Sequence, residues 1–152
     1  MQTIEIIITK ARVMEEVAAS TAYAGAKTDT QDPESSYYRI AASSTDSAIF
    51  GRFWRESCSR IADELKNFVT DACFGDEVFS LSLLASGSFD AAFIPSVNAD
   101  IHAAAVADLT ASWFQYTVPA RAQEWRTQCR QAIDNALSKL YHRKAPRRSK
   151  SK

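Results

Sequence analysis

The sequence predicts a mainly α-helical domain: a bundle of about four helices with one β-hairpin, followed by a disordered basic C-terminal tail. Three observations lead to this prediction. Apolar residues recur every three or four positions over three long stretches, as they do in amphipathic helices. Only four Gly and four Pro occur among 152 residues, which favours regular secondary structure over loops. The length fits one domain, placed at residues 1–141, with residues 142–152 as the tail.

The first segment is open to two interpretations. Residues 3–9, TIEIIIT, are rich in β-branched side chains and fit either a strand or the apolar lead into a helix. A helix is predicted over residues 10–24, with Gly25 placed to end it. The polar stretch AKTDTQDPESS follows as a loop. Within it, residues 32–34 have the order of a helix N-cap, a first-turn proline and an acidic first turn.

One long helix is predicted from the segment STDSAIFGRFWRESCSRIADELKNFVTDACFGD. Ser44 or Thr45 is placed to cap its start, and Gly75 is placed to end it. Gly51 lies inside this helix, where a glycine often marks the close approach of another backbone. The apolar positions step by three and four and form one stripe: Ile49, Phe50, Phe53, Trp54, Cys58, Ile61, Ala62, Leu65, Phe68, Val69 and Ala72.

The predicted β-hairpin comes from the segment EVFSLSLLASGSFDAAF. Residues 79–83 alternate between large apolar side chains and serine, which is the period of a half-buried strand. Residues 85–88, ASGS, predict a turn, and residues 89–93 alternate again. These two alternating runs are the expected hairpin strands.

Two further helices are predicted, each beginning at a proline. The segment PSVNADIHAAAVADLTASWFQYT begins at Pro95 and has one apolar side. The segment PARAQEWRTQCRQAIDNALSKLY begins at Pro119 and is strongly periodic through Leu140. The joint is so short that the two form either an antiparallel helix hairpin or one kinked helix.

The formal net charge of zero hides two opposed regions. All 18 acidic residues but only twelve of the 18 Lys and Arg lie at or before Tyr141, so residues 1–141 carry a charge of −6. The tail YHRKAPRRSKSK carries the other six cations: Arg143, Lys144, Arg147, Arg148, Lys150 and Lys152. We expect this tail to contact either phosphates of a nucleic acid or the acidic body of a neighbouring subunit.

No catalytic or metal-binding pattern stands out. His102 lies among alanines on a helix, and His142 lies in the tail, so neither has neighbours that predict acid–base work. The three cysteines, Cys58, Cys73 and Cys129, lack any zinc-ligand spacing. We therefore expect no enzyme, no cofactor and no metal. The chain also lacks a basic leader and a membrane-length apolar run, which predicts a soluble intracellular protein.

The large aromatic residues fit the core in most cases. The pairs Phe53–Trp54 and Trp113–Phe114 diverge around their helices, so one member of each pair is expected to face outward. Outward aromatic residues are typical of subunit interfaces. The sequence therefore offers Phe53, Trp113 and Phe114 as candidate subunit contacts.

The layout resembles the small neck proteins of tailed bacteriophages, the head–tail connectors or adaptors. The features that carry the resemblance are the helix DSAIFGRFWRESCSRIADELKNF, the hairpin VFSLSLLASGSFDAAF, the helix ADIHAAAVADLTASWFQYT, a proline break, and the final helix with a basic end, ARAQEWRTQCRQAIDNALSKLYHRKAP. The chain is similar to uncharacterised proteins encoded among structural genes of phages and prophages of gut Bacteroidales.

The resemblance implies a structural virion protein that assembles as a homo-oligomeric ring between portal and tail after synthesis in the bacterial cytoplasm. Its partners would be its own copies, the portal protein, other neck or tail proteins and the packaged DNA. No catalytic residue carries over from that family. The alternative, from the residues themselves, is a small nucleic-acid-binding module that acts through its basic tail.

Overall fold

The computed structural model describes residues 1–28, 42 and 46–145, and these form four α-helices and one three-stranded antiparallel sheet. The predicted mainly α class is confirmed. In chain order the elements are β1 (Gln2–Thr9), α1 (Lys10–Thr28), α3 (Ser47–Glu64), β2 (Val69–Phe74), β3 (Val78–Ala85), the short 3-10 helix η2 (Ala91–Phe93), α4 (Ile94–Thr117) and α5 (Pro119–Tyr141).

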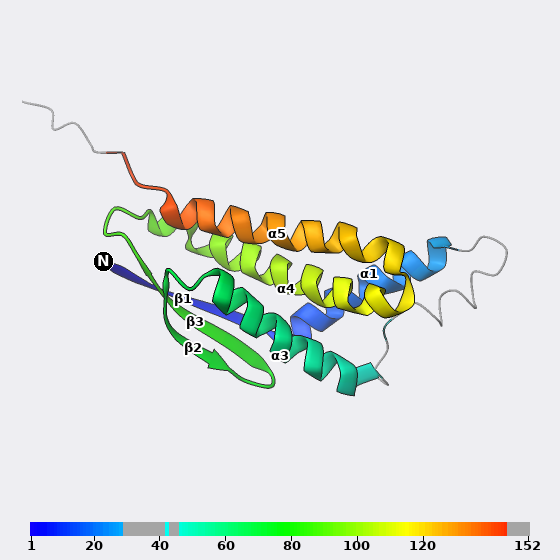
Figure 1. The fold of residues 1–152 in the computed structure, drawn as a ribbon. Helices are drawn as coiled ribbons and strands as arrows, with labels where there is room; N and C mark the ends of the chain where they lie inside the picture. Colours follow the sequence, from blue (N-terminus) through cyan, green and yellow to red (C-terminus); the bar gives the residue numbers. More distant parts are fainter. Residues whose placement is uncertain (29–41, 43–45, 146–152) are drawn as a thin grey trace, which may run out of the picture.

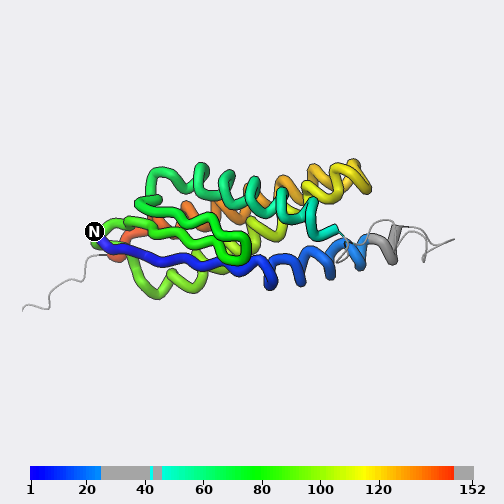
Figure 2. Tube along the Cα trace, turned by 90° about the horizontal axis from the view of Figure 1, so that it is seen from below, coloured from blue at the N-terminus to red at the C-terminus, as the bar shows by residue number. Residues whose placement is uncertain are grey.

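The elements form layers, with the sheet on one side and α5 on the other (Figure 1). The strand order is β1-β3-β2, so β3 is the central strand. In the view from below, the strands lie in front of α4 and α5, while α3 runs along the β2 side (Figure 2). Helices therefore cover only one face of the sheet.

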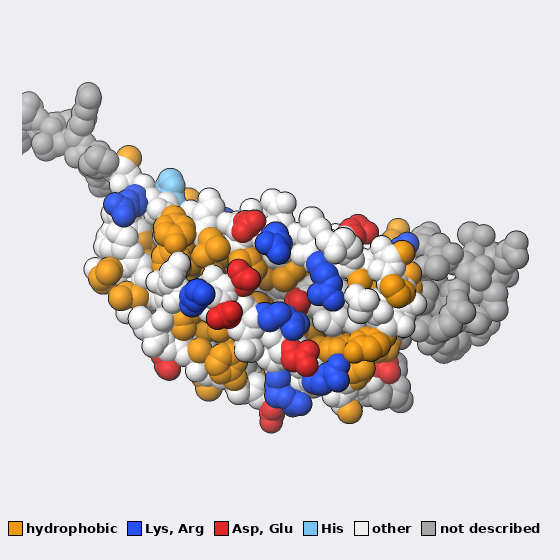
Figure 3. Space-filling view, viewed as in Figure 1, with side chains coloured by type: hydrophobic (Ala, Val, Ile, Leu, Met, Phe, Trp, Pro, Cys, Tyr) orange, Lys and Arg blue, Asp and Glu red, His pale blue; other side chains and the backbone are white. Residues whose placement is uncertain are grey.

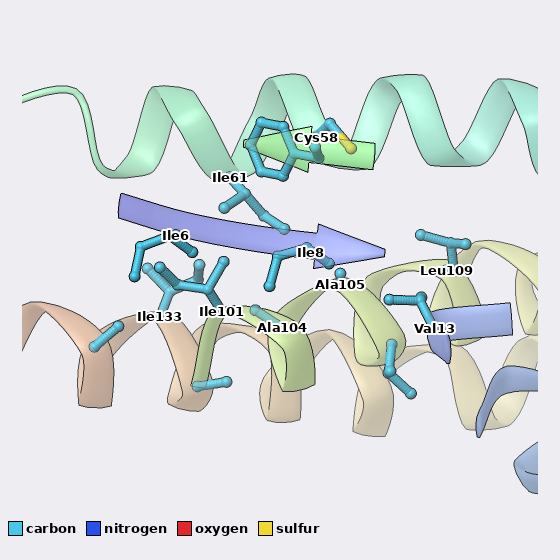
Figure 4. Packing of buried hydrophobic residues seen from close by; sticks show 14 of the residues in the cluster. Ile6, Ile8, Val13, Cys58, Ile61, Ile101, Ala104, Ala105, Leu109 and Ile133 are labelled. Carbon is cyan, nitrogen blue, oxygen red and sulfur yellow. The ribbon is translucent and has the colours of Figure 1, made fainter. Parts of the chain in front are cut away.

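The first segment is a strand because its isoleucines alternate. Ile4, Ile6 and Ile8 are buried, and the residues between them point to the other face. Figure 4 shows Ile6 and Ile8 on the side of β1 that faces α4, close to Ile101. Of the two interpretations of residues 3–9, the strand is the one that occurs.

The middle of helix α4 is buried around its whole circumference. Eight consecutive residues, 104–111, are buried, which no helix with a solvent face achieves. Five of the twelve residues in the central stretch 100–111 are alanine, and their small side chains allow neighbouring elements to approach closely. The helix packs against β1, α1, α3 and α5, and it is the centre of the domain.

The predicted single helix up to Gly75 is wrong in its second half. The helix α3 ends at Glu64, a turn follows at Leu65, and the chain returns as strand β2. The backbone amide of Leu84 in β3 donates to the carbonyl of Phe68 (2.7 Å). If residues 68–74 continued the helix, backbone groups of β3 such as this amide would lose their hydrogen-bond partners. Gly75 is the first residue of the turn between β2 and β3.

The predicted hairpin also has a different composition. The strand at residues 79–83 is confirmed as β3, but it pairs with β1 and β2 and not with residues 89–93. The turn at residues 86–88 is present, with the amide of Phe89 bonded to the carbonyl of Ser86 (2.9 Å). The next residues form η2, where the Asp90 carboxylate accepts from the amide of Ala92 (3.1 Å).

The remaining helix boundaries show one further error and one decision between alternatives. The helix α1 continues past Gly25 to Thr28, so Gly25 does not end it. Helices α4 and α5 lie side by side in opposite directions, so the antiparallel helix hairpin is the alternative that occurs (Figure 1). The predicted cap at residues 32–34 and the capping residues Ser44 and Thr45 lie outside the described residues.

Gly51 has no backbone close to it, contrary to the expectation for a mid-helix glycine. A Cβ at this position would meet only the end of the Arg55 side chain, at 4.0 Å. At Gly75, by contrast, a Cβ would lie 2.6 Å from the carbonyl oxygen of Val78. An added side chain would therefore fit at position 51 but would collide with the backbone at position 75.

We expect Gly51→Ala to raise the free energy of unfolding by about 0.5–1 kcal/mol, because alanine restricts the unfolded chain and favours the helix. Urea unfolding checks this as a higher midpoint at an unchanged slope. The matched control Gly75→Ala should lower the midpoint. A midpoint for Gly51→Ala at or below that of the native sequence would contradict the packing described here.

Candidate interaction surface

The three aromatic residues predicted as subunit contacts are buried. Phe53, Trp113 and Phe114 expose 2%, 9% and 0% of their surface, so the expectation that one member of each pair faces outward is wrong. The reason is that α3 and α4 face each other, and the wide core between them takes both members of each pair. The outward aromatic residue here is Tyr116, whose ring stacks on Phe53 at 6.0 Å between centroids.

The described root of the basic tail contacts the body. The backbone amide of Lys144 donates to the carbonyl of Ser88 (2.8 Å), and its ammonium lies 3.8 Å from the carboxylate of Asp90. The ring of His142 meets the Phe93 ring edge-on at 5.4 Å between centroids. Residues 142–145 are exposed but attached, so the tail is not free from residue 142 onward. Of the six predicted contact cations, Arg143 and Lys144 are described and exposed, whereas Arg147, Arg148, Lys150 and Lys152 lie outside the described residues.

His102 and the cysteines do not assemble into a nucleophilic pair. His102 Nε2 lies 2.8 Å from a Glu16 oxygen and links α4 to α1. Burial raises the pKa of Cys58 to about 12 and that of Cys129 to about 11, and the Asp108 carboxylate contributes to both shifts. Both thiols therefore stay protonated near neutral pH and are poor nucleophiles. Cys73 is exposed on β2.

A charged groove of about 210 Å³ lies between α3, α4 and α5. At its base, Asp108 of α4 is largely buried and accepts two hydrogen bonds from the Arg60 guanidinium, at 2.7 and 3.2 Å. Arg60 also lies 3.9 Å from Glu56. Figure 3 shows acidic and basic side chains interspersed on this side of the molecule. The charges of the groove neutralise one another, so the groove has no strong preference for an ion of either sign.

Residues 1–28, 42 and 46–145 contain no group of three or more His, Cys, Asp or Glu side chains that could hold a metal ion. Within the same ranges, no helix combines the length and apolar character that a membrane span requires.

The outer face of the sheet is the surface that helices leave uncovered. Cross-strand partners point to the same face. Ser82 of β3 is paired with Glu5 of β1 and with Asp71 of β2, and Ser80 is paired with Ile7 and Cys73. We call the outward residues of the three strands the open face: Thr3, Glu5, Ile7, Asp71, Cys73, Val78, Ser80, Ser82 and Leu84.

The open face carries acidic groups without cations. Residues 1–9 and 68–86 contain Glu5, Asp71, Asp76 and Glu77 but no Lys or Arg. Glu5 is held by the Ser82 hydroxyl, which donates to both carboxylate oxygens at 2.8 and 3.0 Å. The cation closest in the chain is Lys10, whose backbone amide donates to the carbonyl of Glu77. Even with Lys10 included, the sheet has a net negative charge.

Exposed apolar side chains gather at the same end of the sheet as the acidic turn 75–77. Ile7 is 58% exposed, Val78 is 42% exposed and Phe74 is 54% exposed. Ile7 and Val78 are diagonal neighbours on the open face, because Ile7 is paired with Ser80. Phe74 is paired with the buried Phe79 and stacks on it, so its exposed ring lies at the β2 edge on the other face of the sheet. Exposed apolar side chains such as Ile7 and Val78 beside charged groups are typical of a protein-contact surface.

The outer edge of β1 is partly capped. Lys10 bonds to Glu77 in line with the β1–β3 register, so even-numbered residues of β1 bond to β3 and odd-numbered ones point their backbone groups outward. One of these outward groups, the amide of Ile7, donates to the Asn98 side chain at 3.2 Å. Strand addition at this edge would have to displace that bond.

Sequence reasoning missed the open face because β2 was assigned to a helix. The alternation in residues 3–9 was visible, and it already separated Thr3, Glu5 and Ile7 from the buried isoleucines. What the sequence did not supply was the register that brings Asp71 and Cys73 to the same face. No protein-family model, no curated protein and no solved structure matches this chain.

We expect Cys73 to react rapidly with a disulfide reagent at pH 8, while Cys58 reacts only after unfolding. A thiol with a pKa of about 12 is thiolate in about one molecule in 10,000 at this pH. Stopped-flow absorbance should show one fast phase that Cys73→Ser removes. A fast phase that survives Cys73→Ser would contradict this assignment.

Proposed function

We propose that this chain is a structural subunit of a tailed-phage neck that assembles into a homo-oligomeric ring between the portal and the tail. The observation that carries the proposal is the open face, where exposed Ile7 and Val78 lie beside carboxylates and the strands contain no Lys or Arg. A stable monomer gains nothing from such a surface, whereas an assembling subunit buries it. The resemblance of the layout to phage neck proteins is the reason to propose a neck ring rather than another assembly.

A ring requires a contact between two different surfaces. The candidate surfaces differ on this chain: the sheet is acidic and partly apolar, whereas the C-terminal tail is basic. A contact between unlike patches is heterologous and closes into a ring when its rotation divides a full turn. In the proposal, the subunit acts in the virion without catalysis or cofactor. Its partners are its own copies, the portal protein, other neck or tail proteins and DNA in the channel.

We expect the purified protein to form a discrete oligomer that Ile7→Lys with Val78→Lys dissociates. Both side chains are exposed, so the double variant should keep its fold and raise the dissociation constant at least about tenfold, equivalent to about 1.4 kcal/mol per contact. Sedimentation velocity across a concentration series measures the oligomer, and circular dichroism measures the fold.

The matched control is Tyr116→Lys, which changes an exposed side chain of α4 away from the sheet. It should leave the oligomer intact. A native protein that stays monomeric at every concentration, with and without the portal protein, would sink the proposal. An oligomer that the double variant forms equally well would move the contact away from the open face.

The second candidate is a nucleic-acid-binding module, favoured by six tail cations with no acidic residue after Asp134. This candidate predicts that a monomeric protein binds duplex DNA. The logarithm of its binding constant should fall with the logarithm of the salt concentration with a slope of about −5, because about six phosphates are neutralised. Deletion of residues 142–152 should abolish that binding in a fluorescence-anisotropy titration. Binding that survives the deletion, or that salt does not weaken, would exclude the tail as the binding element.

A further inference from the structure

We propose that the basic arm, residues 143–152, of one subunit binds the open face and acidic turn of the next subunit. This inference rests on the ring of the proposed function and assigns its contact. The arm is the occupant that the sheet fits by charge. Lys144 is held by its own body at Asp90, and the four cations beyond this root meet a surface with four carboxylates and no Lys or Arg of its own.

The arm leaves the body at one end of the sheet. Its root is fixed where Lys144 bonds to the Ser88 carbonyl, just after β3 ends at Ala85. Gly87 lies at the same end, since a Cβ on it would be 3.4 Å from the backbone nitrogen of Met1. Figure 1 shows the chain leaving α5 on the side where the N-terminus lies.

The acidic turn lies at the opposite end of the sheet. Ala85 is paired with Gln2 at the near end, and Val78 is paired with Thr9 at the far end. Asp76 and Glu77 directly precede Val78, and the exposed Ile7 lies close to them in the β1–β3 register. The exit of the arm and the acidic turn are therefore separated by the full length of β3.

The arm of the same subunit would have to be almost fully extended to bring its last residues near the acidic turn. The seven residues after Ala145 span at most about 25 Å when fully extended. The eight residues of β3 alone cover about 23 Å, and the path from Ser88 around the end of the sheet adds to this. An arm that enters from a neighbour placed head to tail has no such limit. The contact is then heterologous, as a ring requires.

The contact consists of several weak ion pairs, and together they make the binding of the arm sensitive to salt. An exposed ion pair contributes little because water and salt screen it, so no single pair holds the arm. Four pairs delivered by one tether act together, because each bound cation raises the local concentration of the next. The exposed Ile7 and Val78 add apolar area that salt does not screen.

The test mixes two full-length chains. One carries Ser149→Cys in the arm together with Cys73→Ser; the other keeps the native sequence, with Cys73 exposed on the open face. Under mild oxidation at low salt, we expect a disulfide between the two chains, seen as a dimer band on non-reducing gels and mapped to Cys73 by mass spectrometry. The native chain alone sets the background from Cys73 and Cys129.

Two controls define the charge dependence. Asp76→Lys with Glu77→Lys in the native chain should lower the yield of the cross-link at least about fivefold, and so should 0.5 M salt. The exposed pair Glu124→Lys with Asp134→Lys changes the charge of α5 equally and should leave the yield unchanged. Equal losses from both double variants would overturn the assignment of the acidic turn.

The outcomes separate this inference from the proposed function. A chain with both cysteines that forms only an internal disulfide places the arm on its own sheet and overturns the inference. A ring that forms without the inter-chain disulfide overturns the inference and leaves the neck proposal standing. A monomer at every concentration overturns both. An arm that links to Cys73 only when duplex DNA is absent retains the contact and identifies DNA as a competitor.

Discussion

The burial of the middle of α4 on every side is the constraint on which the rest of the structure depends. A helical stretch with no solvent face needs partners all round, and the sheet, α1, α3 and α5 supply them. Its polar groups must then be satisfied inside the protein. The Thr110 hydroxyl donates to the carbonyl of Val106 (2.7 Å), and Arg60 pairs with Asp108. Near the start of α4, the Lys139 ammonium of α5 donates to Ser96 and Asp100 and fixes the helix hairpin.

The elements that the sequence predicted well are those whose signals are local. Two prolines marked the starts of α4 and α5, and the alternation of residues 79–83 marked β3. The second half of the predicted long helix failed because Phe68, Val69 and Ala72 satisfy a helical stripe and also pack against the core from a strand. The strand forms because β3 pairs with it, and the position of β3 depends in turn on β1, whose paired residues lie about 70 to 80 positions away in the chain.

The candidate surface was harder to predict than the fold. Its members come from three strands, and only the register shows that Glu5, Ser82 and Asp71 form one row. The aromatic residues misled for a related reason: a helix with two neighbours in the core can bury adjacent side chains, so adjacency did not imply exposure. The charge separation between body and tail was visible in the sequence, but the absence of cations from the sheet is meaningful only once the strands are known.

The hydrogen bond from the Ile7 amide to Asn98 has a consequence for how the sheet can grow. A three-stranded sheet with two edges is a template on which strands of other copies could stack without limit. The Asn98 side chain occupies a donor in the second half of β1, so growth at that edge starts with a loss. Strand addition on the β1 side is thereby disfavoured. In the proposed ring, association uses the open face and the tail, and a contact between these unlike surfaces can close into a particle of finite size.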